Sequence, residues 1–463
     1  MERRDFLRRS LALGAAGAAG AGVPLAALRT DRPAATPTGG VPRAGSGAAP
    51  PRVDGARLNA DVQALRRFGG TPDGGTHRVA YSDEDLAGRA WVAERMREAG
   101  LTVRIDPAGN LVGELAGADP SLPPLALGSH IDTVPFGGSY DGTIGVMGAV
   151  EIVRALHEAG HRLRHPLRLY DFQNEEGGKT GSRLLIGHVA PEELAVVTAS
   201  GLTIGEGIAR LGGDLHDLAA ARLAPGSLAA FLELHIEQGA TLERAGIPVG
   251  VVEGIVGIRR WFVTVTGEQN HAGTTPMAQR RDALVAASRM VVAIHETART
   301  LPGRQVATVG RVEVDPGAAN VIPGSVRFTL EIRDLTMDGI DAVFAAVRER
   351  AASIARETGT TAAFEPYYLS EAAPTAEPLR RHLEAAADAI ALRHLRLPSG
   401  AGHDAQSMAR LCPIAMVFVP SRGGVSHAPG EYTAPDQITA GVEVLMGALL
   451  HTDAGGDEAT PGA

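Results

Sequence analysis

Short apolar runs alternate with helical periodicity over residues 54–248. Ser82 is placed to cap a helix that Gly100 ends, and a second helix is expected from about Ile144 to Ala159. The expected strands are Thr102–Ile105, Leu111–Glu114, Leu125–Gly128 and Leu167–Phe172. Strands that alternate with helices predict an α/β sheet covered on both faces.

A different order of elements is expected over residues 258–368. In chain order it consists of the strand Arg260–Thr266, the helix Asp282–Arg299, the strands Gln305–Val314 and Ser325–Arg333, the helix Asp338–Glu357 and the strand Thr361–Tyr368. The order β-α-β-β-α-β is that of the ferredoxin-like, or split βαβ, unit. Residues 376–451 return to helix–strand patterns, with Ile414–Val419 as a buried strand. The unit is therefore expected to be an insertion in a discontinuous α/β domain.

The first residues resemble an export signal. A basic start is followed by a weakly apolar stretch, rich in alanine and glycine, that ends near residue 28. Arg3-Arg4, followed by Asp5-Phe6-Leu7, resembles the twin-arginine export motif. The alternative is an N-terminal amphipathic helix. We expect export in the folded state, which suits an enzyme that acquires its metal in the cytoplasm. The expected location is the periplasm.

Composition shifts set the expected segment boundaries. Residues 30–52 are rich in Ala, Pro, Gly and Thr, which is typical of a disordered linker. The expected segments are an export signal over 1–30, a linker over 31–53, a catalytic domain over 54–248 and 369–452, an inserted lid or dimerisation domain over 249–368 and a disordered tail over 453–463. No segment reaches about 18 uninterrupted apolar residues, so we expect no stable membrane association.

The composition excludes several classes of function. The chain has 463 residues with 44 Lys+Arg against 53 Asp+Glu, a formal net charge of −9. A net negative chain without a basic stripe and interleaved aromatics is not expected to bind nucleic acid. The single cysteine, Cys412, excludes an internal disulfide, and its place before a buried strand predicts a core residue rather than a nucleophile. Metal ligands therefore have to come from the 15 histidines and 53 acids.

Some candidate metal ligands follow predicted strands. His130 comes at the end of an apolar run, and Asp132 could fix its tautomer. Glu175-Glu176 follows another strand; adjacent carboxylates repel, and binding one to a metal relieves this while the other acts as a base. Ligands in open α/β sheets collect at the carboxyl ends of strands, so we expect these groups to share one edge.

Three further candidates complete the set. Asp141 lies on a glycine-rich loop that opens the next helix, where a carboxylate could bridge two cations. His235 lies in the segment ELHIEQG, and His427 lies in VSHAP, after the strand that ends near Pro420. Five nitrogen and oxygen ligands with one bridging carboxylate would make a two-metal site, and imidazole with carboxylate suits zinc.

The motifs around these residues resemble those of a known family. In order, they are GSHIDT, GSYDG, NEEG, ELHIEQG, NHAGTTPM, NVIPG, EIRD, GAGHDA and VSHAP. The same order is seen in zinc-dependent amidohydrolases of the M20 metallopeptidase superfamily. The chain is most similar to the hydantoinase/carbamoylase group, which includes N-carbamoyl-L-amino acid hydrolases and allantoate amidohydrolases, over about residues 60–450. The resemblance implies a zinc-exopeptidase-like α/β catalytic domain that carries a ferredoxin-like insert.

The resemblance also implies a role for each candidate. One zinc would be held by His130, Asp141 and His235, and the other by Asp141, Glu176 and His427, with manganese or cobalt as possible replacements. Glu175 would be the general base. His271 of the insert would stabilise the oxyanion, in such enzymes often across the interface of a homodimer.

His271 and four further residues would bind the substrate. The resemblance assigns this role to Gln238, Asn320 and Arg333, with Arg333 forked onto the α-carboxylate, and Gly402 would line the pocket through its backbone. After Glu175-Glu176-Gly177 the family usually carries an Arg-Phe pair, whereas this chain has Gly178-Lys179-Thr180.

Other motif matches are expected to be structural. The segment His157–His161 matches the zincin pattern H-E-x-x-H, but Gly160 is expected to end the helix and to separate the two histidines. Gly178-Lys179-Thr180 is similar to the end of a phosphate-binding loop, which would need a glycine at Gln173. The glycines around 205–213 lack the strand–turn–helix context of a dinucleotide site.

These observations predict a dinuclear zinc amidohydrolase. It would cleave a C–N bond of a ureido or carbamoyl group on a small carboxylate, and an N-carbamoyl-L-amino acid would give the amino acid, carbon dioxide and ammonia. The first alternative is an allantoate or related ureide amidohydrolase. The second is an exported dipeptidase or aminoacylase, against which His235 argues because peptidase branches tend to carry a carboxylate there. The third is a non-catalytic binding protein, which would be expected to have lost ligands or the base.

Overall fold

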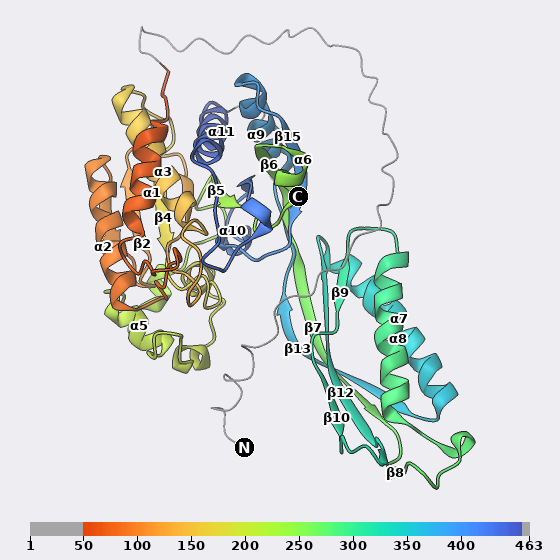
Figure 1. Ribbon diagram of the computed structural model, residues 1–463. Coiled ribbons are helices and arrows are strands. Elements are labelled where there is room, and N and C mark those ends of the chain that lie inside the picture. Colours follow the sequence, from red (N-terminus) through yellow and green to blue (C-terminus); the bar gives the residue numbers. More distant parts are fainter. Residues whose placement is uncertain (1–49, 456–463) are drawn as a thin grey trace, which may run out of the picture. The chain divides into compact units, whose positions relative to one another are not determined.

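A mixed nine-stranded sheet forms the centre of the structure, a computed structural model that describes residues 50–455 (Figure 1). Its strand order is β1-β2-β4-β3-β5-β16-β6-β14, and β15 pairs with β6. The strands are β1 (Thr102–Ile105), β2 (Leu111–Leu115), β3 (Leu125–His130), β4 (Leu167–Phe172), β5 (Ala230–Ile236), β6 (Val249–Ile255), β14 (Ala373–Pro374), β15 (His394–Ser399) and β16 (Ile414–Val419). The neighbours β4, β3, β5 and β16 run parallel, so their carboxyl ends meet at one edge.

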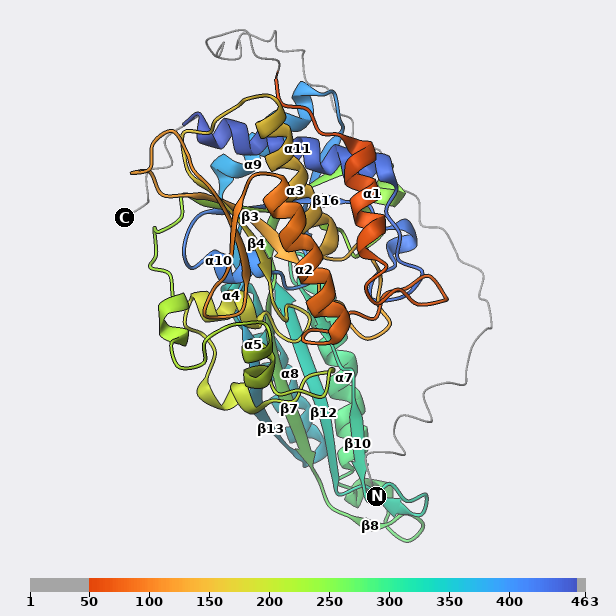
Figure 2. The same ribbon diagram turned by 90° about the vertical axis from the view of Figure 1, so that its left-hand side faces the viewer.

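Helices cover both faces of this sheet, because alternate side chains of its strands enter two different cores. In β16, Ala415 and Val417 lie in one core, whereas Met416 and Phe418 lie in the other. The first face carries α1 (Gly55–Leu65), α2 (Asp83–Glu98), α3 (Thr143–Glu158), α9 (Glu377–Ala389) and α11 (Pro435–Asp453). The second carries α4 (Thr180–Leu185), α5 (Ile204–Arg210), α6 (Thr241–Ala245) and α10 (Asp404–Met408). Figure 2 shows α2 and α3 side by side over the first face.

The signals read from the sequence set the ends of these helices. Ser82 Oγ accepts a hydrogen bond from the backbone N–H of Asp85 at 3.2 Å and caps α2. Gly100, with φ +97°, follows the other end of α2 in a conformation that favours glycine. Short 3₁₀ helices complete the connections: η1 (Pro191–Ala195), η2 (Leu218–Ala221), η3 (Met277–Gln279) and η4 (Arg422–Gly424).

A second, antiparallel sheet is built from residues between β6 and β14. Its order is β10-β12-β7-β13, and β9 also pairs with β12. Its elements are β7 (Gly257–Thr266), α7 (Ala283–Thr300), β9 (Val306–Thr308), β10 (Val312–Asp315), β12 (Ser325–Asp334), α8 (Met337–Thr358) and β13 (Thr361–Ser370). Trp261, Val263 and Val265 of β7 point into a separate apolar core shared with α7 and α8. This part of the chain therefore has a core of its own.

The structure corrects one predicted strand of this second sheet. The run Gln305–Val314, expected as a single strand, is divided into β9 and β10. The interruption includes Gly310, and a glycine inside a strand weakens the pairing and often marks an irregularity. A two-stranded ribbon of β8 (Asn270–His271) and β11 (Val321–Ile322), which the pattern did not predict, lies at one end of the sheet (Figure 1).

Several predicted boundaries keep the status of predictions. The export signal over 1–30, most of the linker over 31–53 and most of the tail over 453–463 lie outside the described residues. Residues 50–455 belong to one compact unit, so the boundary between a catalytic and an inserted domain stays a prediction. Within residues 50–455, none of the helices combines the length and the apolar character that a membrane crossing requires.

Candidate metal centre

Four neighbouring strand ends bring the predicted metal ligands together. His130 is the last residue of β3, and Glu175-Glu176 follows β4 directly. His235 lies near the end of β5, and His427 follows β16 after η4. Because β4, β3, β5 and β16 are parallel neighbours, their carboxyl ends form one polar edge of the sheet.

The fifth candidate, Asp141, enters this edge from the loop before α3. The next residue, Gly142, has φ +62°, and a Cβ at this position would lie 2.5 Å from the imidazole of His130. Only glycine permits this approach, which brings the start of α3 against the end of β3. The backbone N–H of Gly142 also lies 3.2 Å from His235 Nε2.

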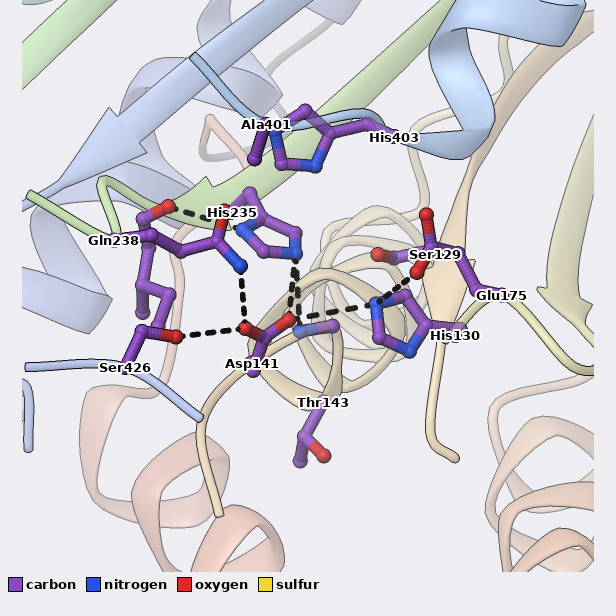
Figure 3. Close-up of polar contacts among 12 residues, drawn as sticks. Ser129, His130, Asp141, Thr143, Glu175, His235, Gln238, Ala401, His403 and Ser426 are labelled. Carbon is purple, nitrogen blue, oxygen red and sulfur yellow. Dashed lines mark hydrogen bonds and ion pairs between the residues drawn. The ribbon is translucent and has the colours of Figure 1, made fainter. Parts of the chain in front are cut away.

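The two carboxylate oxygens of Asp141 face different groups of side chains (Figure 3). Oδ1 lies 3.5 Å from His130 Nε2 and 3.0 Å from His235 Nε2. Oδ2 lies 3.4 Å from His427 Nε2, which is 3.5 Å from Glu176 Oε1. We call His130, Asp141 and His235 the first cluster, and Asp141, Glu176 and His427 the second; within each, the possible ligand atoms lie within 4.8 Å of one another.

The clusters differ in burial. His130 and His235 are buried, whereas the side chain of His427 is 48% exposed. Burial raises the pKa of Asp141, but the imidazoles of His235, His130 and His427 outweigh this and hold it well below its usual range. Burial, together with Asp141 and Glu175, raises the pKa of Glu176 well above the usual value.

The chemistry of these donors fits divalent cations. Each cluster offers imidazole nitrogen and carboxylate oxygen, the set typical of zinc, and one carboxylate has an oxygen in each cluster. Three carboxylates, Asp141, Glu175 and Glu176, are packed at the edge, and buried charges of one sign require a compensating charge. The residues present therefore fit a pair of metal ions.

Asp132 is placed to position both the first histidine and the candidate base. His130 Nδ1 lies 2.9 Å from the backbone carbonyl of Asp132 and 3.8 Å from its carboxylate, so the carbonyl is the nearer group that can fix the tautomer of His130. The carboxylate instead accepts hydrogen bonds from the backbone N–H groups of Glu175 and Glu176, at 3.1 and 3.2 Å. Glu175 Oε2 lies 3.8 Å from His130 Nε2.

Residues that the sequence did not single out hold the Asp141 loop. Glu431 Oε1 accepts hydrogen bonds from the backbone N–H groups of Tyr140 and Asp141, at 2.9 and 3.1 Å. Ser426 Oγ lies 3.0 Å from both Asp141 Oδ2 and Glu431 Oε2 and can donate its single proton to either carboxylate. Burial and the charge of Asp141 raise the pKa of Glu431. The only signal in the sequence was a glutamate four residues after His427.

A second unpredicted group lies behind His235. The ring of His403 packs edge-on against that of His235 (Figure 3), with centroids 4.4 Å apart. His403 Nε2 lies 2.8 Å from Ser399 Oγ. Burial, with the neighbouring His235, holds the pKa of His403 well below its usual value. Glu233 is buried beside them and accepts hydrogen bonds from Ser129 Oγ and the backbone N–H of Ala405.

The predicted substrate-binding residues divide into two groups. Gln238, Arg333 and Gly402 line a cavity of about 370 Å³ together with both clusters. Gln238 Nε2 donates to Asp141 Oδ2 at 2.6 Å, and Arg333 donates to Glu331 Oε1 at 2.8 Å. His271 and Asn320 do not line this cavity; they lie at the β8–β11 ribbon, where the backbone N–H of Ala272 donates to Asn320 O. His271 is exposed there.

The motif matches expected to be structural give no competing site in the described residues. His157 is in the last turn of α3, His161 lies beyond Gly160, whose φ is +59°, and the two histidines form no candidate metal group within residues 50–455. Cys412 is buried in the second core, and burial raises the pKa of its thiol to about 12.

Comparisons with known proteins agree on one family. The model of peptidase family M20/M25/M40 matches residues 126–451. An N-carbamoyl-L-amino acid amidohydrolase of Geobacillus stearothermophilus is 40% identical over 400 residues, which cover 85% of this chain and 97% of the relative. An allantoate amidohydrolase of Bacillus subtilis is 35% identical, over 84% of this chain and 95% of that one. The crystal structure of a hydantoinase/carbamoylase family amidase from Burkholderia multivorans superimposes with a TM-score of 0.79 at 37% identity, covering 87% of this chain and 98% of the other.

Proposed function

This chain belongs to peptidase family M20/M25/M40, and on that premise we propose that it hydrolyses the ureido group of an N-carbamoyl-L-amino acid. It is a hydrolase of carbon–nitrogen bonds in linear amides, as its named relatives are amidohydrolases. The observation that carries the proposal is the pair of clusters joined by Asp141, which opens into the cavity lined by Arg333.

We propose that His130, Asp141 and His235 hold one divalent cation, and that Asp141, Glu176 and His427 hold the other, with zinc as the native metal. Such ions, when bound, polarise the scissile carbonyl and lower the pKa of the attacking water. Gln238 Nε2, which donates to Asp141 Oδ2, is then free to turn toward the substrate.

Glu175 is the proposed general base. Its backbone is fixed by Asp132, and its carboxylate faces the first cluster, so it can accept the proton of the attacking water and deliver it to the leaving nitrogen. Its neighbour Glu176 belongs to the second cluster, which leaves the two adjacent carboxylates with different tasks.

Arg333 is the proposed anchor for the α-carboxylate. Its Nε donates to Glu331 and its Nη1 to the carbonyl of Gly400, which hold the guanidinium plane at the wall of the cavity. A planar guanidinium matches a carboxylate with two parallel hydrogen bonds. The backbone of Gly402 lines the same wall.

We propose that the second sheet is a ferredoxin-like lid that also forms a homodimer. The order β10-β12-β7-β13, with both helices in one core, supports the first part. The position of His271 and Asn320 outside the cavity of their own chain supports the second, because a partner subunit could supply them. Export by the twin-arginine route to the periplasm is proposed on the leader sequence alone.

The test is ammonia release by the mature protein, loaded with Zn²⁺ or Mn²⁺. We expect ammonia from N-carbamoyl-L-alanine, whereas release from allantoate alone would favour the ureide alternative, and cleavage of a dipeptide without ammonia would contradict the proposal. Glu175→Gln should lower kcat by about 10²–10⁴-fold while the bound metal content stays unchanged. Full activity of that variant would remove Glu175 from its role.

The contribution of a partner subunit has its own test. His271→Ala and Glu175→Gln should each be nearly inactive, but a mixed dimer has one site with both native groups if His271 acts across the interface. Co-expression with two different tags, followed by double purification, should restore activity. Inactive mixed dimers would place His271 outside the partner's site.

A further inference from the structure

Lys179 is the single lysine of the chain, and it lies in the wall of the candidate active site. It precedes α4 with φ +59°, and its backbone N–H donates to Glu175 O at 2.7 Å. This hydrogen bond fixes Lys179 on the loop that carries the proposed base. Its side chain lines the same cavity as Arg333.

The Lys179 ammonium has one hydrogen-bond partner and no ion pair among residues 50–455. Nζ donates to Gln406 Oε1, a neutral acceptor, which leaves further N–H donors available. Burial lowers the pKa of Lys179, although Glu175, Asp404 and Glu233 act in the opposite direction. A buried cation without a bonded anion is costly, and such groups are normally paired. The cavity therefore offers a cation that is ready for an anionic partner.

The fold makes room for this ammonium at Gly402. A Cβ at Gly402 would lie 2.8 Å from Lys179 Nζ, closer than real contacts allow. The absence of a side chain at Gly402 thus lets the ammonium reach the cavity wall. The rotamer is also supported by α10, because Gln406 belongs to that helix and α10 packs against α4.

The other cations around the cavity are paired with acids. Arg260 and Arg333 both bind Glu331, at 2.6 and 2.8 Å. Two guanidinium groups share one carboxylate, so one positive charge is left for the α-carboxylate of the proposed substrate. Lys179 adds a second positive charge that this substrate group does not use.

Lys179 also lies where two cavities meet. A second cavity, of about 620 Å³, shares Lys179 and Tyr368 with the cavity of the metal centre. Its own arginines are paired, Arg183 with Glu193 at 2.8 Å and Arg410 with Glu371. A substrate side group that extends from the metal centre toward the second cavity would therefore meet Lys179 as its free cation.

We propose that Lys179 selects ureido substrates with a second carboxylate, of the class of N-carbamoyl-L-aspartate and N-carbamoyl-L-glutamate. The inference rests on the proposed function, since it assigns Arg333 to the α-carboxylate and Lys179 to the carboxylate of the side group. An ammonium is a point charge on a flexible stem, so it can follow side groups of different length more easily than a planar guanidinium.

The experiment compares an acid with its neutral isostere, N-carbamoyl-L-glutamate with N-carbamoyl-L-glutamine. Because charge-assisted hydrogen bonds contribute more than neutral ones, Lys179→Met should lower the kcat/KM ratio of acid to amide by about 10–100-fold. The change should lie mainly in KM, and Lys179→Arg should recover part of the ratio. Arg299→Met, which removes a cation on the exposed surface of α7 outside both cavities, is the control and should leave the ratio unchanged. An unchanged ratio in Lys179→Met would overturn the inference.

A binding measurement separates this inference from the proposed function. Because the chain has one lysine, acylation of Lys179 in the wild-type protein can be followed by peptide mass spectrometry without interference from other lysines. N-carbamoyl-L-glutamate should protect Lys179 at a concentration at least about tenfold lower than N-carbamoyl-L-glutamine does. Protection without ammonia release would support the acid-binding site and contradict the reaction. Ammonia release with equal protection by both compounds would support the reaction and contradict the role of Lys179.

Discussion

The two sheets of this protein differ in whether charged residues are buried around them. In the region of the nine-stranded sheet, Arg78, Asp85, Arg89 and Asp171 are all buried. The core of the second sheet is apolar, and the buried polar residues described between 257 and 370 are Thr297, Gln305 and Thr360, none of which is charged. Burying charge costs stability unless every group is paired. The region of the candidate metal centre therefore contains a set of buried charged residues, which we call the electrostatic framework, and the described core of the second sheet has none.

This framework reaches the metal centre directly. Arg78 Nε donates to the carbonyl of Ile131 at 2.8 Å, next to His130. Arg89 binds Asp171 at 3.3 Å and donates to the carbonyl of Gly109 at 2.8 Å. The buried charges therefore hold the ends of β3 and β4, from which the ligands project.

The largest expected effect comes from the carboxylate shared by both clusters. Asp141→Asn keeps the shape of the side chain but removes its charge, so both cations should bind more weakly. Removing a group that only hydrogen-bonds to a metal ligand typically lowers metal affinity or activity by about 10–100-fold. Because Asp141 is itself a proposed ligand, we expect activity to fall by more than about 100-fold. Metal content and ammonia release are the measurements. Asp436→Asn, on the exposed start of α11, is the control, and retention of both metals in Asp141→Asn would contradict the shared role.

The next effect concerns a buried ion pair in the region of the nine-stranded sheet. Arg89→Met leaves Asp171 buried without its cation, and breaking a buried pair in this way costs about 3–5 kcal/mol. Urea unfolding at constant metal concentration measures the change. The double variant Arg89→Met/Asp171→Asn should recover part of the loss. A single variant that loses less than about 1 kcal/mol would show that the pair is not a stabilising element of this region.

The same framework should make stability depend on pH. Burial raises the pKa of Asp85 to about 6, against the opposing charge of Arg89. In the unfolded chain this carboxyl loses its proton near pH 4, whereas the folded protein keeps it until about pH 6. Between these values the folded state binds more protons, so stability from this group falls as pH rises, by about 2–3 kcal/mol.

The measurement is the difference in unfolding free energy between the parent and Asp85→Asn at pH 4.5 and pH 7. We expect the parent to lose stability relative to the variant as the pH rises. Asp338→Asn on the exposed first turn of α8 is the control, because this carboxylate forms no ion pair within residues 50–455. A difference that does not change with pH would remove Asp85 from the framework.

The smallest effect is expected on the surface of the second sheet. Arg289 of α7 forms an ion pair with Glu357 of α8, and both side chains are largely exposed. Exposed pairs contribute about 0–1 kcal/mol, so Arg289→Gln should change the free energy of unfolding by less than about 1 kcal/mol. The same urea titration used for Arg89→Met measures it. A loss as large as that of Arg89→Met would abolish the contrast between the two regions.

Sequence patterns predicted the parts of the molecule that depend on local order. The end of α2 at Gly100 and the polar ends of β3 and β4 follow from periodicity, turn residues and apolar runs. The five candidate ligands come from short motifs, and the structure brings them to one edge. These features are local because a few consecutive residues determine where a strand ends and where a helix is capped.

Contacts between distant segments could not be predicted in the same way. Glu431 holds the Tyr140–Asp141 backbone from the far end of the chain, and Arg89 of α2 forms an ion pair with Asp171 of β4. Neither pair has a spacing that periodicity could detect. His271 and Asn320 are a different case. Within one chain they lie outside the cavity, so the pattern of a single chain cannot place them there.

The chain order of the ligands has a consequence for how the protein is made. The first cluster is encoded between His130 and His235, before any residue of the second sheet. The second cluster is complete only after His427 has been synthesised. Strand β16, which pairs with β5, is made in the same late part of the chain. A nascent chain therefore holds all the residues of the first cluster while about half of the polypeptide is still unmade, whereas the second cluster is complete only when synthesis is almost finished.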